Sequence, residues 1–129
     1  LGRRKLHLSG IGPFAVADEP TSVEVTVPRE PYSFDLLVTI IASTSSTGDE
    51  GTIEVTTSLG SETIDFVGTA TDEIDDAHTY VVQVSWGAGV PADMGDETIE
   101  IEFALDDGER LLVWGITFEA LGSETLEIS

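Results

Sequence analysis

Apolar residues alternate with polar residues along most of this chain, and this alternation limits the folds that it can adopt. The stretch SVEVTVP places Val23, Val25 and Val27 on one face of an extended segment and Glu24 and Thr26 on the other. A period of two is that of a β-strand, whereas a helix requires a period of about 3.6. The alternation recurs, strictly or in part, at residues 32–43, 51–59, 62–68, 78–86, 97–105, 110–121 and 125–129.

Turn-forming residues separate these segments. Gly60 lies in SLGSE and Gly108 in DDGE, both typical of hairpin turns, and Gly108 can adopt a positive φ. About eight short strands at regular spacing, with no helical segment, predict an all-β fold, an antiparallel β-sandwich. The Cys…Trp…Cys core of an immunoglobulin-like sandwich is missing, so we prefer a jelly roll. We assign residues 21–129 to this single domain.

Two of the segments are apolar on both faces. In YSFDLLVTIIAS, Leu37 and Ile41 lie on the face opposite Leu36. In RLLVWGITFEAL, one of two pairs must point away from the core: Leu111 with Val113, or Leu112 with Trp114. A two-layer sandwich cannot bury both faces of a strand, so we expect an apolar outer surface that another segment or another molecule covers.

Gly115 interrupts the second of these segments. Strict alternation would place Trp114 on one face with Leu112, Ile116 and Phe118. A glycine inside a strand marks a β-bulge or a close approach of another backbone. We therefore expect an irregularity in the strand at this position.

The chain is strongly acidic. It contains 25 Asp and Glu residues against 5 Lys and Arg residues, for a formal net charge of −20. Such self-repulsion destabilises a compact state, but at about 1 M salt the screening length falls to about 3 Å. The composition is similar to that of proteins from extremely halophilic archaea and their viruses. An acidic domain that binds cations or basic partners is the alternative.

The sequence carries no signature of catalysis. It has no Cys and no G-x-S-x-G nucleophile elbow. His7 and His78 are its only histidines, and the spacing pairs neither of them with a serine and an aspartate. We therefore expect no enzymatic activity and no cofactor. No apolar run is long enough for a membrane span, and the sequence has no Asn for N-glycosylation.

Two features are candidates for ligand binding. The loop DEIDD carries Asp72, Asp75 and Asp76, and clustered carboxylates bind hard cations such as Ca²⁺. The loop lacks the glycine and the closing glutamate of the helix–loop–helix calcium motif, and other loops are equally acidic, so we assign no metal site to it. Trp86 and Trp114 are candidates for stacking on a sugar, but a place in the core or in a subunit interface is the preferred interpretation.

Residues 1–20 form a basic segment at the start of this acidic chain. Three of the five basic residues are gathered there: Arg3, Arg4 and Lys5. The glycines and proline of GIGPF predict a loose, extended arm. The apolar residues that would anchor the arm are Ile11, Phe14 and Val16. We expect the arm to contact a neighbour's acidic surface, nucleic acid or an acidic lipid surface, and the sandwich to fold without it. The alternative is a tail whose charge is incidental.

A small acidic all-β domain with a basic, glycine- and proline-containing N-terminal arm resembles the single jelly-roll coat, penton or decoration proteins of haloarchaeal viruses. The segment LLVWGITFEAL is also similar to the last strand of many viral and carbohydrate-binding jelly rolls. The resemblance implies a structural subunit located in the virion, which forms homo-oligomers or binds other virion proteins and catalyses nothing. A haloarchaeal cell-surface or pilus adhesion module and a carbohydrate-binding module remain the alternatives.

Overall fold

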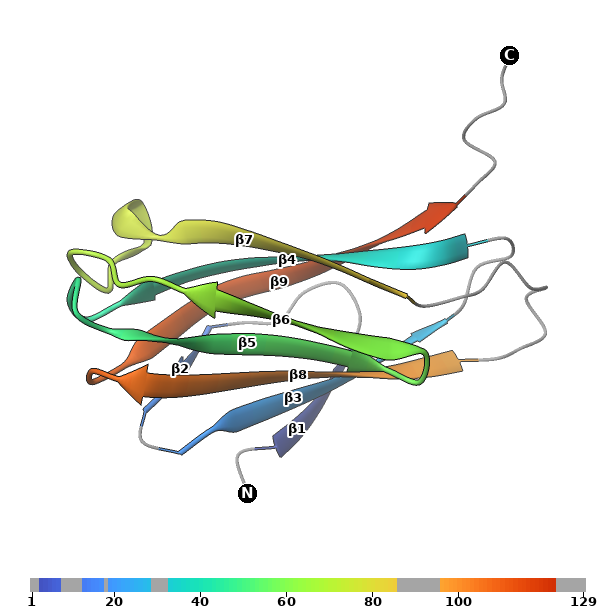
Figure 1. Cartoon of the computed structure of the whole chain (residues 1–129), viewed down its shortest axis with the longest axis horizontal. Coiled ribbons are helices and arrows are strands. Elements are labelled where there is room, and N and C mark those ends of the chain that lie inside the picture. Colours follow the sequence, from blue (N-terminus) through green and yellow to red (C-terminus); the bar gives the residue numbers. More distant parts are fainter. Residues whose placement is uncertain (1–2, 8–12, 18, 29–32, 86–95, 123–129) are drawn as a thin grey trace, which may run out of the picture.

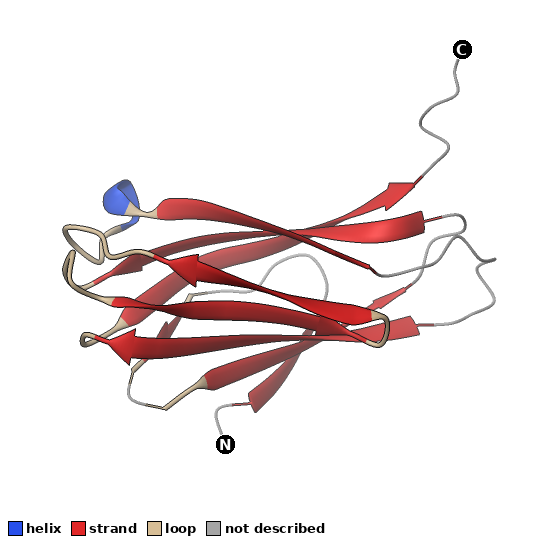
Figure 2. Cartoon of the chain, in the orientation of Figure 1, coloured by secondary structure: helices blue, strands red, loops and turns tan. Residues whose placement is uncertain are grey.

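The computed structural model describes residues 3–7, 13–17, 19–28, 33–85 and 96–122. These residues form nine β-strands and one short 3₁₀-helix, η1 (Ile74–Asp76) (Figures 1 and 2). The strands are β1 (Arg3–His7), β2 (Phe14–Val16), β3 (Thr21–Pro28), β4 (Ser33–Thr44), β5 (Glu50–Thr57), β6 (Gly60–Phe66), β7 (His78–Ser85), β8 (Asp96–Asp107) and β9 (Leu111–Gly122). The predicted all-β fold is confirmed; the expected last strand at 125–129 lies outside the described residues.

The strands form two sheets that pack face to face as a β-sandwich (Figure 1). One sheet has five strands in the order β1-β3-β8-β5-β6, and the other has four in the order β2-β9-β4-β7. All pairings are antiparallel except that of β1 with β3, which is parallel. The predicted antiparallel sandwich is therefore confirmed, with one parallel strand added at an edge.

The pairing of the eight strands from β2 to β9 is nested. The outermost strands pair with each other, β2 with β9, and the pairs β3 with β8, β4 with β7 and β5 with β6 follow inward. This is the order of one long antiparallel hairpin that has been folded over into two layers. The contacts of β4 with β9 and of β5 with β8 then complete the sheets.

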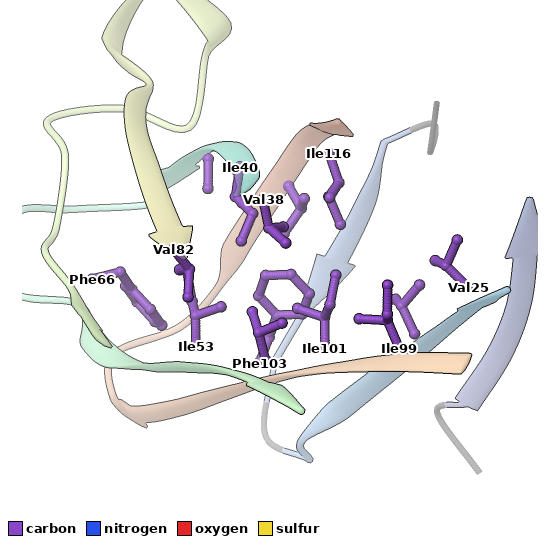
Figure 3. Close-up of a cluster of buried hydrophobic side chains, with 14 of the residues drawn as sticks. Val25, Val38, Ile40, Ile53, Phe66, Val82, Ile99, Ile101, Phe103 and Ile116 are labelled. Atoms are coloured by element: carbon purple, nitrogen blue, oxygen red, sulfur yellow. The ribbon is translucent and has the colours of Figure 1, made fainter. Parts of the chain in front are cut away.

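The core lies between the sheets and consists of the inward-facing residues of each alternating strand (Figure 3). Ile99, Ile101 and Phe103 of β8 are fully buried, as are Val38 and Ile40 of β4. Their neighbours along each strand point outward, as the pleat requires. The alternation read from the sequence therefore places the core correctly in these strands.

The described parts of the N-terminal segment, residues 3–7 and 13–17, belong to the sandwich. They add one strand to each sheet, β1 beside β3 and β2 beside β9. Val16 is fully buried in the core. The Phe14 ring packs edge-on against Phe103 of β8, with 5.5 Å between ring centroids and an interplanar angle of 74°. Part of the predicted arm thus completes the core of its own chain.

Candidate assembly interface

The outer face of the four-stranded sheet carries almost no charge. Its pleat turns Leu37, Thr39 and Ile41 of β4 away from the buried residues Leu36, Val38 and Ile40. The register then aligns these outward residues with those of the flanking strands, for example Thr39 with Val81 of β7 and with Thr117 of β9. We define the uncharged face as the outward residues Leu37, Thr39, Ile41, Thr79, Val81, Gln83, Leu112, Trp114 and Thr117.

The apolar members of the uncharged face are partly open to solvent. Val81 is 53% exposed and Ile41 is 37% exposed, and Leu37, Leu112 and Trp114 are half-buried. Leu112 and Trp114 are thus the pair of the last strand that faces away from the core, whereas Leu111 and Val113 are buried. The expected apolar outer surface is present.

Carboxylates border this face at one end. Asp35 lies beyond Leu37 along β4, Glu119 of β9 pairs in register with Leu37, and the side-chain N–H of Gln83 donates to Asp35 at 2.6 Å. No other described residue of the outer face of this sheet carries a charge. In a chain with a net charge of −20, this is the part of the described surface where a second acidic molecule meets least repulsion.

A β-bulge at Trp114 and Gly115 explains why β9 is apolar on both faces. Ile41 pairs with Gly115 but Ala42 pairs with Val113, so Trp114 is an extra residue in its strand. The bulge shifts the alternation by one position. Because of this shift, the prediction that Trp114 shares a face with Ile116 and Phe118 is wrong: Ile116 is buried and Phe118 packs against the core, whereas Trp114 faces outward.

Trp114 is held in place on this outer face. Its indole N–H donates to the hydroxyl of Ser43 at 3.0 Å, and Ser43 is fully buried. A Cβ added at Gly115 would meet no atom within 4 Å, so the face is open on the far side of the bulge. The ring of Trp114 therefore forms a fixed apolar part of the surface. The second predicted aromatic, Trp86, lies outside the described residues.

The outer face of the five-stranded sheet has the opposite character. Glu24 of β3 pairs in register with Glu100 of β8, and Glu102 of β8 pairs with Glu54 of β5. Residues that face each other in neighbouring strands have Cβ atoms about 5 Å apart, so like charges there repel. This face carries a ladder of carboxylates, and its stability depends on counter-charges or on salt.

The basic N-terminal segment lies at the edge of that acidic sheet. In the parallel pairing of β1 with β3, Arg3 is in register with Ser22, Arg4 with Val23 and Lys5 with Glu24. Three of the five basic residues of the chain thus belong to the edge strand of its most acidic sheet. Ile11, the remaining predicted arm residue, lies outside the described residues.

The acidic loop before β7 is held by internal bonds rather than arranged around a cation. Asp72 forms an ion pair with Arg110, and Asp76 accepts a hydrogen bond of 2.6 Å from the Thr71 hydroxyl. Asp75 is exposed. Among the described residues, no three carboxylate or imidazole groups are placed to hold a metal ion. The exposed His78 stacks on Tyr80, with 6.2 Å between ring centroids.

The polar cluster at one end of the sandwich was not predicted. Asp49 is buried between β4 and β5, and its carboxylate accepts hydrogen bonds from the N–H and hydroxyl groups of Ser45 and Ser46 and from the N–H of Glu109. Burial raises the pKa of Asp49, but these hydrogen bonds, with that of the Ser45 side chain foremost, outweigh it and leave the pKa below its ordinary value. Nothing in the loop sequence STSSTGDEG distinguishes a buried, hydrogen-bonded aspartate from an exposed one.

An open depression of ≈ 450 Å³ lies beside Asp49. Glu50, Asp65 and Asp106 contribute carboxylates to its lining, and Phe66 contributes its ring. The donors around Asp49 already satisfy its oxygens, so this residue is used for folding. The depression therefore has an acidic rim.

Comparison with known proteins gives no family assignment. No protein-family model matches the chain, and no curated protein is similar to it. Within the described residues, no helix has the length and hydropathy needed to cross a membrane. The interpretation of the chain therefore depends on its own geometry.

Proposed function

We propose that this protein is a non-enzymatic structural subunit that assembles with copies of itself, or with other structural proteins, in a high-salt environment. The observation that carries the proposal is the uncharged face of the four-stranded sheet. It is an apolar, partly exposed surface on an otherwise strongly acidic molecule. Such surfaces are typical of protein–protein contacts, whereas monomeric soluble proteins rarely expose large apolar patches.

The two sheet faces support this function by their contrast. Contacts between ladders of carboxylates are repulsive, and salt only weakens that repulsion. Apolar contacts persist in salt, because excluded salts strengthen rather than weaken the burial of apolar surface. Contact through Ile41, Val81 and Trp114 is therefore the arrangement that a high-salt assembly would favour.

The strand order supports the jelly-roll interpretation of the sandwich. The nested pairing from β2 to β9 is that of a long hairpin rolled into two four-stranded layers, with β1 added outside it. An immunoglobulin-like sandwich would not join its first strand to its last in this nested way. A jelly roll with an acidic surface and a basic N-terminal strand is the basis for proposing a coat, vertex or decoration protein of a haloarchaeal virion.

A carbohydrate-binding module is the second candidate, because Trp114 lies on the outer face of a sandwich sheet. Its indole N–H is already donated to Ser43, and its ring is half-buried. The polar groups of the uncharged face are the Gln83 amide and the threonine hydroxyls, which offer few donors for hydrogen bonds to sugar hydroxyls. We therefore place this candidate behind the structural subunit.

The test compares two threonine-to-glutamate variants at molar NaCl. Thr117→Glu adds a charge at the centre of the uncharged face, and Thr98→Glu adds the same charge to an exposed position on the other sheet. Light scattering and electron microscopy of the purified protein should show oligomers or particles for the unmodified chain and for Thr98→Glu, and a loss of assembly for Thr117→Glu. A strictly monomeric unmodified chain at high concentration and molar salt would refute the proposal.

A further inference from the structure

We infer that the edge strand β7 pairs with β7 of a second copy of this chain, antiparallel and about a two-fold axis, so that the four-stranded sheets of the two copies become one continuous sheet. The inference depends on the strand edges and holds whatever larger structure the protein builds. It names a contact along the border of the sheet, in addition to the uncharged face itself.

Edge strands present unpaired backbone N–H and C=O groups, and proteins usually protect them with charge, shortness, bulges or proline. The described sheets have four edges. At three of them a protection is visible: β1 carries Arg3, Arg4 and Lys5, β2 has only three residues, and β6 carries Glu62 and Asp65.

The fourth edge, β7, has none of these protections. It runs for eight residues, HTYVVQVS, with no acidic residue, lysine, arginine, proline or glycine. It pairs with β4 over His78–Ser85 without a bulge, and no strand pairs with its other side in the described part of the chain. In Figure 1, the first part of β7 lies at the upper border of the molecule next to η1, and its second part crosses the ribbons of β4 and β9 in this view.

The strand is also fixed in an extended position, ready to pair. Val82 and Val84 are each 2% exposed and anchor β7 to the core. The Tyr80 hydroxyl accepts a hydrogen bond from the backbone N–H of Val67 at 3.0 Å and donates one to the Val67 carbonyl at 3.3 Å. The Thr57 hydroxyl donates to the carbonyl of Ser85 at 2.6 Å. A partner strand would meet a pre-ordered edge, so little conformational entropy would be lost on pairing.

Charge selects a second copy of this chain as the partner. Most of the described surface would repel another molecule of the same net charge, but β7 and its outward neighbours on β4 and β9 are uncharged at their centre. The β7 strands of two copies can pair antiparallel. When odd-numbered residues lie opposite odd-numbered residues, they share a face of the joined sheet. Val81 would lie opposite Val81 or Gln83 of the second copy, and Val82 and Val84 would stay in the core.

Pairing at β7 also brings together the two β6 strands beneath it. β6 packs beside β7 at this border of the sandwich and carries Glu62 and Asp65. Their mutual repulsion is long-range in dilute buffer and is screened within about 3 Å at 1 M salt. We therefore expect the pairing to form at molar salt and to dissociate in dilute buffer.

The absence of cysteine in the sequence allows a direct test with single spin labels on the full chain. Val81→Cys and Thr117→Cys, each labelled with a nitroxide, place probes at exposed sites of β7 and β9. In the edge-paired dimer the backbones at position 81 lie roughly 5–8 Å apart, whereas the two β9 strands are separated by five strand spacings, or about 24 Å. At molar salt, strong dipolar broadening is expected for the label at 81 and weak coupling for the label at 117.

Other outcomes would overturn the inference. Face-to-face stacking would bring the two sheets within about 10 Å and couple labels at 117 at least as strongly as those at 81. That result would leave the proposed assembly standing but refute edge pairing. No coupling at either position would refute both contacts. Circular dichroism of each labelled variant verifies the fold, and slower hydrogen exchange of the β7 amides at high than at low protein concentration, both at molar salt, provides a readout without any substitution.

Discussion

A methyl group on Gly108 would lie 1.9 Å from the Oδ1 atom of Asp49. Gly108 also has a φ of 117°, in the region that favours glycine. The turn between β8 and β9 thus folds directly over a buried carboxylate, which in turn accepts the N–H of Glu109 at 3.1 Å. This contact joins the β8–β9 turn to the loop between β4 and β5.

Replacing Gly108 by alanine should destabilise the protein by at least about 2 kcal/mol, because backbone strain and the clash with Asp49 add together. Urea unfolding at molar salt is the measurement. Gly115→Ala is the matched control, because a Cβ there meets no atom within 4 Å, and it should be nearly neutral. Equal stability of the two variants would contradict the close packing of Asp49 and Gly108.

Asp49 should make the stability of the protein depend on acidic pH. Its pKa is lower in the folded state than in the unfolded state, so the stabilisation is complete above the ordinary pKa of about 3.9 and is lost as the pH falls through the lower folded value. The free energy of unfolding should fall below about pH 4 more steeply for the unmodified chain than for Asp49→Asn. Parallel curves for the two proteins would mean that this carboxylate is not preferentially stabilised by its donors.

Phe14→Ala should lower the free energy of unfolding by about 2–3 kcal/mol, since the ring is half-buried and loses its edge-on contact with Phe103. Ala15→Ser, at the exposed neighbouring position, should be close to neutral.

Deleting residues 1–17 should destabilise the sandwich severely, because Val16 and the pairing of β2 with β9 are lost. This revises the expectation that the sandwich folds without the N-terminal segment. A melting temperature of the deletion variant equal to that of the unmodified chain would contradict this prediction.

The protein should lose tertiary structure when salt is removed. Near-ultraviolet circular dichroism, which reports on its two tryptophans, should change below a few hundred millimolar salt, where the screening length rises towards about 10 Å. Glu102→Gln removes one partner of the cross-strand pair with Glu54 and should shift the transition to lower salt.

The exposed loop residue Glu73 provides the control for this titration. Glu73→Gln removes the same charge without changing the ladder and should shift the transition less than Glu102→Gln. An unchanged spectrum of the unmodified chain in dilute buffer would contradict the halophilic interpretation of the composition.

The strands and the core were predictable where the alternation is strict, as in β3 and β8, because burial on one face is what produces the pattern. The phase of β9 was not, since a bulge at Trp114 shifts the pattern by one position and the glycine beside it indicates only that some irregularity exists. The parallel pairing of β1 with β3 could not be predicted either. The strand between them, β2, belongs to the other sheet, and no local sequence pattern indicates which strands become neighbours.

The candidate interface was predicted in part. The doubly apolar segments indicated an outward surface that includes Leu37 and Ile41, and the structure places Ile41 beside the bulge of Trp114 and Gly115 and Leu37 farther along β4, opposite Glu119. The unprotected edge of β7 could not be recognised from sequence, because HTYVVQVS reads the same in the middle of a sheet as at its border. Asp49 was missed because its role depends on donors that only the folded loops bring together.

The nested pairing has a consequence for biosynthesis. Phe14 pairs with Val113, so β2 can pair with β9 only after all the strands between them have been synthesised. Until then, β2 lacks its partner β9 and β3 can pair only with β1, and the innermost hairpin of β5 and β6 is the first antiparallel pair that can close. Because non-local pairings of this kind slow folding, β2 should be among the last strands to pair, and until β9 has been made, repulsion between the acidic chains keeps the uncovered strands of different molecules apart.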